Sequence, residues 1–181
     1  MENKHIATSL PVQIYETDNR FWTPEVQEYC DNFSDRQNHS TNVKADMSSW
    51  YLYEETTIFN TFFDWILETV NSHPLAPFLQ NWSIGTAWLA KYKEGESTVP
   101  HHHFPAHLSF VYFLKCSEKS SPLNLEGVDI ECREGRLILF PSLMFHHVTA
   151  TPEERIVLAG NINWMPPPNS TPDVKTEDKL W

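Results

Sequence analysis

The feature that most constrains the fold is a series of short apolar runs in the second half of the chain. Each run is rich in β-branched or aromatic residues, and turn residues rather than a helical repeat separate it from the next. Such a series is typical of a sandwich or barrel of antiparallel strands. The runs are NWSIGTAWLAKYKEG, LSFVYFLK, GVDIEC, GRLILFP, HHVTA and RIVLAGNINW. We therefore expect a β-barrel core over residues 80–164.

The first half of the chain predicts helices that support such a barrel. Residues 10–16 alternate apolar and polar positions as a first strand does. Thr23, followed by a proline, predicts the N-cap of a helix over residues 24–33. Residues 54–73 carry one broad apolar face and predict a helix that covers a sheet. The polar residues 34–49 predict a long surface connection.

Length and composition fit one domain. The chain has 181 residues, of which 40% are hydrophobic and 13% aromatic, enough for a substantial core. We expect a single domain over residues 1–164, with an N-terminal strand and support helices in 1–79 and the barrel in 80–164. The Pro-rich polar stretch 165–181 predicts an extended arm. Its terminal Trp181 would dock on this chain or on a neighbour, which leaves a homodimer open.

Charge and cysteine content narrow the possible partners and location. The net charge of −11 repels a phosphate backbone and no Lys/Arg run offsets it, so we expect no nucleic-acid partner. Three widely spaced cysteines, Cys30, Cys116 and Cys132, predict reduced thiols that pack as small core side chains. No run of roughly 18 apolar residues is present, so we expect a soluble, cytoplasmic protein without membrane contact.

Histidines cluster at two places in the predicted barrel. In PHHHFPAHLSFVYFL, His101 and His103 would share one face of a strand, about 7 Å apart at the backbone, while His102 faces away. FPSLMFHHVTA places His146 and His147 at the start of another predicted strand. Two strands could thus bring three imidazoles to one Fe, Zn, Cu or Ni ion. Spacing alone neither names the metal nor chooses between the last two histidines, and a solvated His-rich loop is the alternative.

These histidines and their flanks resemble the Fe(II)- and 2-oxoglutarate-dependent oxygenases. The segments YKEGESTVPHHH, LSFVYFL, EGRLILFPSLMFHHV and ERIVLAGNINW follow one another as in the small microbial and viral members of that superfamily. The likeness to prolyl 4-hydroxylases is looser. The resemblance covers Trp88 to Trp164, nearly half of the chain. It implies a mainly β fold with helices, namely a double-stranded β-helix (a jelly-roll or cupin-like barrel) supported by N-terminal helices.

The resemblance also implies which histidines bind the metal. The family places a Y-x-x-G pattern nine residues before the first metal ligand and a Ser eight residues after it. Tyr92 and Ser109 stand at those positions, and both select His101. The distal ligand follows F-P-S by four residues, which selects His146 over His147.

One ligand position departs from the family pattern, because His103 stands where the usual iron site has Asp or Glu. Three alternatives stay open. His103 is a true third ligand; or His101 and His146 alone bind, and a water or an acid from another loop completes the site; or the pattern is a non-catalytic relic. We take His101, His103 and His146 as the expected metal ligands.

By the same resemblance, Arg155 is expected to hold 2-oxoglutarate. It opens the last strand, nine residues after the distal histidine, and a guanidinium grips a carboxylate through two charge-assisted hydrogen bonds. Asn161 lies on the same strand face and matches an Asn frequent in the small members. Some relatives use a Tyr near Phe113 for this carboxylate, so Tyr92 or Ser109 would compensate for the missing hydroxyl.

Together these features predict an Fe(II)- and 2-oxoglutarate-dependent dioxygenase that uses O2. The resemblance implies hydroxylation of a C–H bond in a peptide side chain or a small metabolite, with release of succinate and CO2. The cofactor would carry the chemistry, so no catalytic residue beyond the metal ligands is expected. The alternatives are a cupin-type three-His metal enzyme without 2-oxoglutarate, a metal-stabilised binding module, and a metal-free jelly roll with surface histidines.

Overall fold

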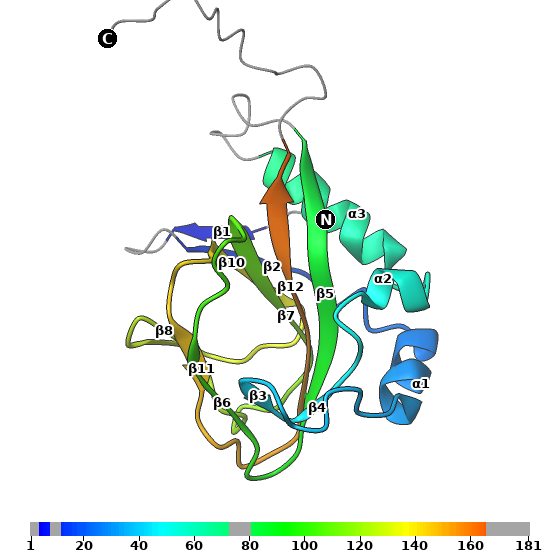
Figure 1. The fold of residues 1–181 in the computed structure, drawn as a ribbon, viewed down its shortest axis with the longest axis vertical. Helices are drawn as coiled ribbons and strands as arrows, with labels where there is room; N and C mark the ends of the chain where they lie inside the picture. The colour runs from blue at the N-terminus through cyan, green and yellow to red at the C-terminus, as the bar shows by residue number, and fades with distance from the viewer. Residues whose placement is uncertain (1–3, 8–11, 73–80, 166–181) are drawn as a thin grey trace, which may run out of the picture.

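Two antiparallel sheets face each other in the computed structural model, which describes residues 4–7, 12–72 and 81–165 (Figure 1). Over these residues the larger sheet has seven strands, in the spatial order β1 (Lys4–Ala7), β2 (Gln13–Glu16), β10 (Arg136–Pro141), β7 (Leu108–Lys115), β12 (Arg155–Trp164), β5 (Trp82–Tyr92) and β4 (Asp46–Met47). The smaller sheet has five, in the order β3 (Val43–Lys44), β6 (Ser97–His101), β11 (His146–Val148), β8 (Leu123–Leu125) and β9 (Val128–Ile130). The mainly β architecture predicted from the short apolar runs is confirmed.

The larger sheet has an apolar core on each of its faces. On β7, Val111 and Phe113 face the smaller sheet, whereas Phe110 and Tyr112 pack under the helices. This alternation is the period of two expected for a strand that is buried on both sides. The space between the sheets therefore holds one core, and the helices cover the other.

Three helices lie on the outer face of the larger sheet, away from the smaller one (Figure 1). They are α1 (Pro24–Asn32), α2 (Leu52–Glu55) and α3 (Asn60–Asn71). The predicted cap of α1 is confirmed, because Thr23 Oγ1 accepts a hydrogen bond from Val26 N at 3.3 Å. In α3, Phe62, Ile66 and Val70 are buried against the sheet, as the apolar repeat predicted.

The single helix predicted over residues 54–73 is wrong in its first third. The chain leaves the helical conformation at Thr56, which is extended (φ −155°, ψ 148°). Its hydroxyl accepts a hydrogen bond from Ile58 N at 3.3 Å, a local contact that competes with helix formation. The helical turn α2 and the helix α3 are therefore separate elements, and the predicted last residue, His73, lies outside the described residues.

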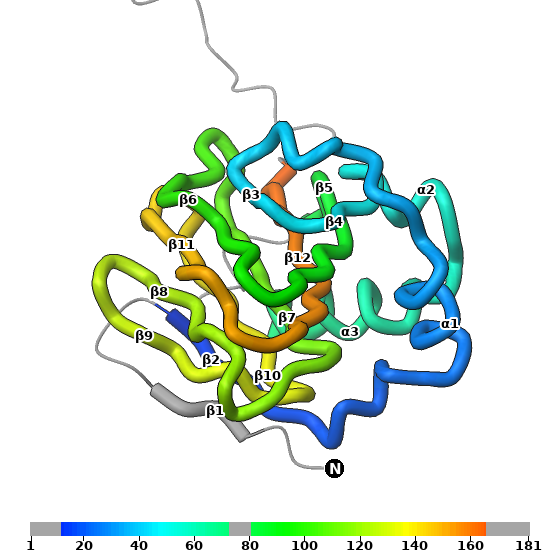
Figure 2. Tube along the Cα trace, turned by 90° about the horizontal axis from the view of Figure 1, so that it is seen from below, coloured from blue at the N-terminus to red at the C-terminus, as the bar shows by residue number. Residues whose placement is uncertain are grey.

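The predicted surface connection over residues 34–49 is also wrong. Its residues Val43, Ala45 and Met47 are buried, and they lie in or between two short strands. β3 pairs with β6 of the smaller sheet and β4 pairs with β5 of the larger one. Figure 2 shows this cyan segment crossing from one sheet to the other at one end of the molecule. The buried residues Val43, Ala45 and Met47 alternate with polar ones over only five positions, too few to predict a strand within a polar segment.

Three further strands were not among the predicted runs, namely β1, β6, which ends in the histidine run, and β8. The Pro-rich arm lies outside the described residues from position 166 on, and so does Trp181. Within the described residues, no helix has the length and apolar character needed to span a bilayer.

Candidate metal site

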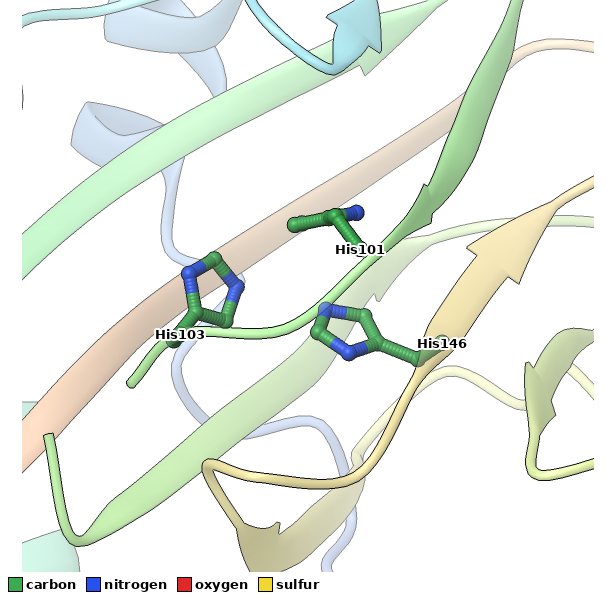
Figure 3. A group of neighbouring side chains, drawn as sticks. All are labelled: His101, His103 and His146. Carbon is green, nitrogen blue, oxygen red and sulfur yellow. The ribbon is translucent and has the colours of Figure 1, made fainter. Parts of the chain in front are cut away.

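The structure brings the three predicted ligand histidines together between the sheets (Figure 3). His101 is the last residue of β6, His146 is the first of β11, and the two are partners in the antiparallel ladder. His103 follows two residues after His101 and returns to the same side, as strand parity predicted. One ring nitrogen from each of the three lies within 4.8 Å of the others, and the ring centroids are 4.3–4.9 Å apart. We call these three residues the histidine group.

Backbone carbonyls orient two of these rings. His101 Nδ1 lies 2.8 Å from Val99 O, and His146 Nδ1 lies 3.1 Å from Met144 O. A carbonyl can only accept, so Nδ1 carries the proton in each ring and donates it. Nε2 then keeps its lone pair, the arrangement in which metal-binding imidazoles are usually held.

Burial keeps the histidine group uncharged. Desolvation lowers the pKa of His101, and it lowers the pKa of His103 to about 3 and that of His146 to about 4, with the neighbouring imidazoles adding to the last two shifts. A low-dielectric site disfavours the charged form of an imidazole. At neutral pH the three rings are therefore neutral, the form that a metal ion requires.

The other histidines of the run lie outside the group. The ring of His102 packs on that of Phe145 at 5.0 Å. His107 Nδ1 accepts a hydrogen bond from Trp164 N at 3.3 Å. His147 follows His146 on β11 and is half-buried, but it does not join the group. The geometry thus agrees with the choice of His146 over His147.

Arg155 is buried in the same interior, with 1% of its surface exposed. Nη1 donates to Ser121 O at 2.6 Å, while Nε is buried without a hydrogen-bond partner. The guanidinium lies between the rings of Tyr92 and Phe113, 5.0 and 5.1 Å from their centroids. Within the described residues no carboxylate forms an ion pair with it, and an uncompensated buried charge costs several kcal/mol. The described residues therefore bury the Arg155 guanidinium without placing a carboxylate beside it.

The other residues predicted to bind the co-substrate form polar links across the interior. Ser109 Oγ donates to Asn161 Oδ1 at 2.8 Å and lies 2.8 Å from Ser142 Oγ, so the Ser142 hydroxyl donates to Ser109. The Tyr92 hydroxyl is hydrogen-bonded to Thr98 Oγ1 at 2.7 Å. Tyr92 and Ser109 line the interior cavity, whereas Asn161 supports Ser109 from behind.

Two cavities meet at the histidine group. The inner one, about 30 Å³, is lined by the three imidazoles and by Arg155. The outer one, about 350 Å³, is lined by residues 40–44, by Trp50 and by Trp88, and it reaches His101 and His103 from the other side. The outer wall was not predicted, because residues 34–49 were expected to form a surface connection. The only available signal was the short alternation of Val43, Ala45 and Met47.

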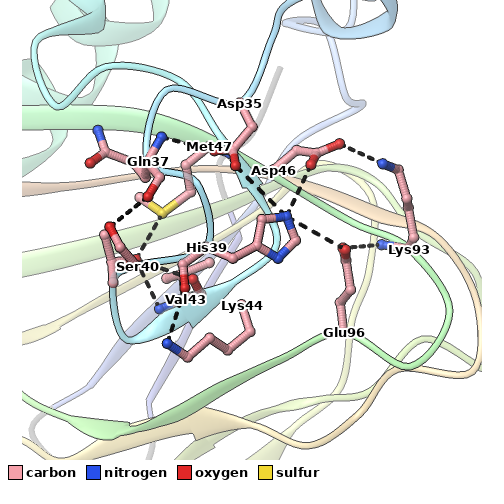
Figure 4. Close-up of polar contacts among 11 residues, drawn as sticks. Asp35, Gln37, His39, Ser40, Val43, Lys44, Asp46, Met47, Lys93 and Glu96 are labelled. Atoms are coloured by element: carbon pink, nitrogen blue, oxygen red, sulfur yellow. Dashed lines mark hydrogen bonds and ion pairs between the residues drawn. The ribbon is translucent and has the colours of Figure 1, made fainter.

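A second group also brings ligand-type atoms within 4.8 Å of one another, namely Asp35, His39 and Asp46, which we call the His39 group (Figure 4). Its carboxylates already have partners. Asp46 Oδ2 lies 2.7 Å from Lys93 Nζ, and Asp46 Oδ1 lies 3.2 Å from His39 Nε2. Asp35 Oδ1 accepts the backbone N–H groups of Gln37 and Met47. These contacts stabilise the conformation of the segment before β4. They leave the carboxylates already occupied, so the group is not a set of free metal ligands.

Several solved structures are similar in fold to this chain. No family model matches the sequence, and no curated protein matches it. A prolyl-4-hydroxylase from Pseudomonas putida is similar in structure, with a TM-score of 0.67 at 14% identity over 87% of this chain and 95% of that one. The epimerase SnoN from nogalamycin biosynthesis, a non-haem α-ketoglutarate-dependent enzyme, has a TM-score of 0.67 at 12% identity over 86% and 80%. HygX from Streptomyces hygroscopicus, solved with nickel and 2-oxoglutarate, has a TM-score of 0.65 at 8% identity over 87% and 84%.

At these identities the likeness establishes the fold. The predicted double-stranded β-helix with supporting helices is confirmed, because the similar structures are 2-oxoglutarate-dependent oxygenases that have this jelly roll. Their names also differ in the reaction, a hydroxylase in one case and an epimerase in another, so the fold alone does not select a substrate.

Proposed function

We propose that this protein is an Fe(II)- and 2-oxoglutarate-dependent dioxygenase that acts on a C–H bond of a small molecule or a peptide side chain. One observation carries the proposal: three neutral imidazoles and a buried arginine without an acidic partner line the same interior cavity. We also propose one domain over residues 1–164. The cytoplasmic location inferred from the sequence remains a prediction.

The histidine group fits a divalent metal ion. Its members are neutral, two of them are oriented through Nδ1, and imidazole nitrogen is a suitable ligand for iron. Because His103 replaces the usual carboxylate, the protein ligands would leave both charges of Fe(II) uncompensated. A dianionic co-substrate would offset them, which favours binding of 2-oxoglutarate at this site.

Arg155 fits the far carboxylate of 2-oxoglutarate. Its Nε has no partner, its side chain is fixed between two rings, and Ser121 O holds Nη1. A fixed guanidinium loses little conformational freedom when it binds a carboxylate. When bound, iron and 2-oxoglutarate would supply the oxidation of the substrate, coupled to conversion of the co-substrate into succinate and CO2. The chain's own residues would hold, orient and shield these groups.

The inner cavity must widen before it can accept the co-substrate. A volume of about 30 Å³ holds only a few water molecules. Leu123 and Val148, on the smaller sheet, line it opposite Arg155 and Val157 of β12. We expect 2-oxoglutarate to select a conformation in which these apolar side chains move apart.

The outer cavity fits the substrate. Its volume of about 350 Å³ lies at the lower end of the range for small-molecule sites. Trp50 and Trp88 form an aromatic wall, with ring centroids 4.8 Å apart, and Asn42 and Lys44 stand on the polar wall. A cavity of this size accepts a metabolite or one side chain of a peptide, and it would bring that group to His101.

Anaerobic titration of the Fe(II)-loaded protein with 2-oxoglutarate tests the proposal. We expect a metal-to-ligand charge-transfer band in the visible region. Arg155→Ala should lose the band at the same co-substrate concentration while retaining iron. Arg133→Ala removes an exposed arginine that pairs with Glu16 at 3.1 Å, and it should behave as the wild type. A wild-type protein that binds iron but shows no band would contradict the proposal.

A three-His metal enzyme that does not use 2-oxoglutarate is the second candidate. The all-imidazole ligand set and the small inner cavity favour it. It predicts iron binding without the band, and iron affinity equal in the wild type and in Arg155→Ala. The same titration therefore separates the two candidates.

A further inference from the structure

Two of the three cysteines lie behind the buried arginine. Cys116 follows the last residue of β7, and Cys132 lies two residues after the end of β9. One backbone and one side-chain hydrogen bond hold the two segments together: Gly135 N donates to Phe113 O at 2.9 Å, and Cys116 N donates to the Glu134 carboxylate oxygen Oε1 at 3.1 Å. Both thiols are half-buried and pack against the core between the sheets.

The two thiols interact with each other, and Cys132 shares an acceptor with Arg155. The Cys116 and Cys132 thiols are near enough for each to shift the pKa of the other, upward for Cys116 and downward for Cys132. Cys132 Sγ also donates to Ser121 O at 3.0 Å, and the same carbonyl accepts Arg155 Nη1 at 2.6 Å. One peptide group therefore connects the thiol pair to the guanidinium.

The pair has one thiol suited to attack and one suited to resolve. The hydrogen bond from Cys116, helped by the charge of Arg155, lowers the pKa of Cys132 against the opposing effect of burial. The same hydrogen bond and burial raise the pKa of Cys116. A thiol beside a cation with a second thiol in reach is the arrangement in which oxidation is fast and ends in a disulfide.

We propose that Cys116 and Cys132 form a reversible disulfide when the protein meets hydrogen peroxide, and that this disulfide weakens binding of 2-oxoglutarate at Arg155. The first part stands on the thiol pair alone. The second part rests on the proposed function.

The oxidation balances with one peroxide. The Cys132 thiolate attacks one peroxide oxygen, the O–O bond breaks, and the leaving hydroxide takes up the proton released by Cys132, which gives a sulfenic acid and one water. The Cys116 sulfur then attacks the Cys132 sulfur. The expelled hydroxide takes the Cys116 proton and leaves as the second water. The two thiols lose two electrons, and one peroxide is reduced to two waters.

The disulfide would stiffen the walls of the inner cavity. Phe113 packs on the guanidinium and lies three residues before Cys116 on the same strand. Ser121, which holds Arg155, is in contact with Cys132. A covalent link across these segments opposes the widening that a cavity of about 30 Å³ needs before it can accept 2-oxoglutarate.

Thiol counting on the metal-free full chain tests the first part. We treat the wild type with hydrogen peroxide, denature it and titrate the free thiols. The count should fall from three to one, with a mass loss of two hydrogens and full recovery in dithiothreitol. Cys116→Ser and Cys132→Ser should form no intramolecular disulfide. Cys30→Ser, which removes a fully buried thiol elsewhere, should still lose two. No loss of thiols, or loss only to sulfinic acid, would overturn the proposal.

Calorimetric titration of Zn(II)-loaded protein with 2-oxoglutarate tests the second part. The oxidised wild type should bind at least about five-fold more weakly than the reduced protein, the lower end of typical coupling between sites. Peroxide should leave the affinity of Cys116→Ser unchanged. A disulfide that forms without changing the affinity for 2-oxoglutarate would overturn only the second part of the proposal, the effect of the disulfide on binding. If the reduced protein binds no 2-oxoglutarate, both the effect of the disulfide on binding and the proposed function are overturned. The first part of the proposal, formation of the disulfide, would be unaffected.

Discussion

The histidine group and the His39 group each bring three ligand-type atoms within 4.8 Å of one another, yet their surroundings differ. In the histidine group, backbone carbonyls are the only polar partners of the two oriented rings among the described residues, and these carbonyls occupy Nδ1. In the His39 group, Lys93 and two backbone N–H groups already occupy the carboxylates. Proximity alone therefore does not mark a binding site. The distinguishing feature is ring nitrogens whose orientation is set by backbone carbonyls at Nδ1 and whose Nε2 has no hydrogen-bond partner among the described residues.

The two groups also differ in charge and exposure. The histidine group is neutral, with His146 buried and His101 and His103 half-buried, and the charged side chain that lines its inner cavity is a cation, Arg155. The His39 group lies nearer the surface, and one of its carboxylates, Asp46, is paired with Lys93, whose side chain is 60% exposed. The first arrangement gains from binding a metal and an anion, whereas the second already has its counter-charges.

The largest difference should appear in metal affinity. His146→Ala removes one of three ligands and should weaken Zn(II) or Fe(II) binding by at least about 100-fold, beyond the usual effect of losing an outer hydrogen-bond partner. His39→Ala should leave the affinity unchanged. Competition with a chelator of known affinity measures both. Equal losses in the two variants would erase the distinction between the groups.

Acid should act on the two groups in separate pH ranges. The pKa values of about 3 for His103 and about 4 for His146 lie below 6.5, so below pH 6.5 the unfolded chain binds protons that the native protein does not. Stability of the metal-free protein should therefore fall with pH, by about 2 kcal/mol from pH 7 to pH 5.5. Urea denaturation at the two pH values measures this. His103→Asn should remove about half of the loss.

The stability contributed by the His39 group should persist to lower pH. Burial alone would raise the pKa of Asp35 and Asp46, but hydrogen bonds outweigh it, and both pKa values lie below 3.8. Depressed carboxylate pKa values contribute stability that is present above pH 3.8 and is lost as pH falls through the native values. Asp46→Asn should thus change the stability curve mainly below pH 4. An equal effect at pH 5.5 would contradict the assignment.

Substitution of Arg155 should change the stability by a smaller amount, and in the opposite direction to substitution of a paired arginine. Arg155→Met replaces a buried charge that lacks an acidic partner, and it should stabilise the metal-free protein by about 1 kcal/mol. Arg136 is a matched control, because its Nη2 lies 2.7 Å from Glu16 Oε1 and both side chains are 15% exposed. Arg136→Met should destabilise the protein. Thermal unfolding of the two variants would show shifts of opposite sign, and shifts of the same sign would contradict this account.

The smallest effect concerns Lys93. Lys93→Met removes an exposed ion pair and should cost less than about 1 kcal/mol of stability. The variant should still bind a single metal ion per chain. A second metal ion bound per chain would show that Lys93 masks a metal site. It would contradict the distinction drawn between the histidine group and the His39 group.

Only part of the histidine group could be predicted from local geometry. The spacing of His101 and His103 predicted a shared face, because strand parity can be read directly from a sequence. The choice of His146 over His147 and the role of Arg155 came from the resemblance to a known family, because the pairing of His146 with His101 joins distant segments. The apolar residues that follow Arg155 agree with its burial.

The outer cavity and the His39 group could not be predicted, because they depend on pairing between distant segments. β3 and β4 are two residues long and exist only through their contacts with β6 and β5. The turn before them uses left-handed backbone at Asn38 and His39, with φ of 49° and 52°. The contact between Cys116 and Cys132 joins two separate loops in the same way.

The segment that crosses between the sheets also suggests where specificity could evolve. β3 and β4 anchor it, and Thr41 Oγ1 ties the turn to Val43. Ser40 and Asn42 line the outer cavity on either side of that tie. Randomising those two positions while keeping Thr41 would vary the chemistry presented to an incoming molecule and leave the anchoring contacts intact. A directed-evolution library for new substrates would begin there.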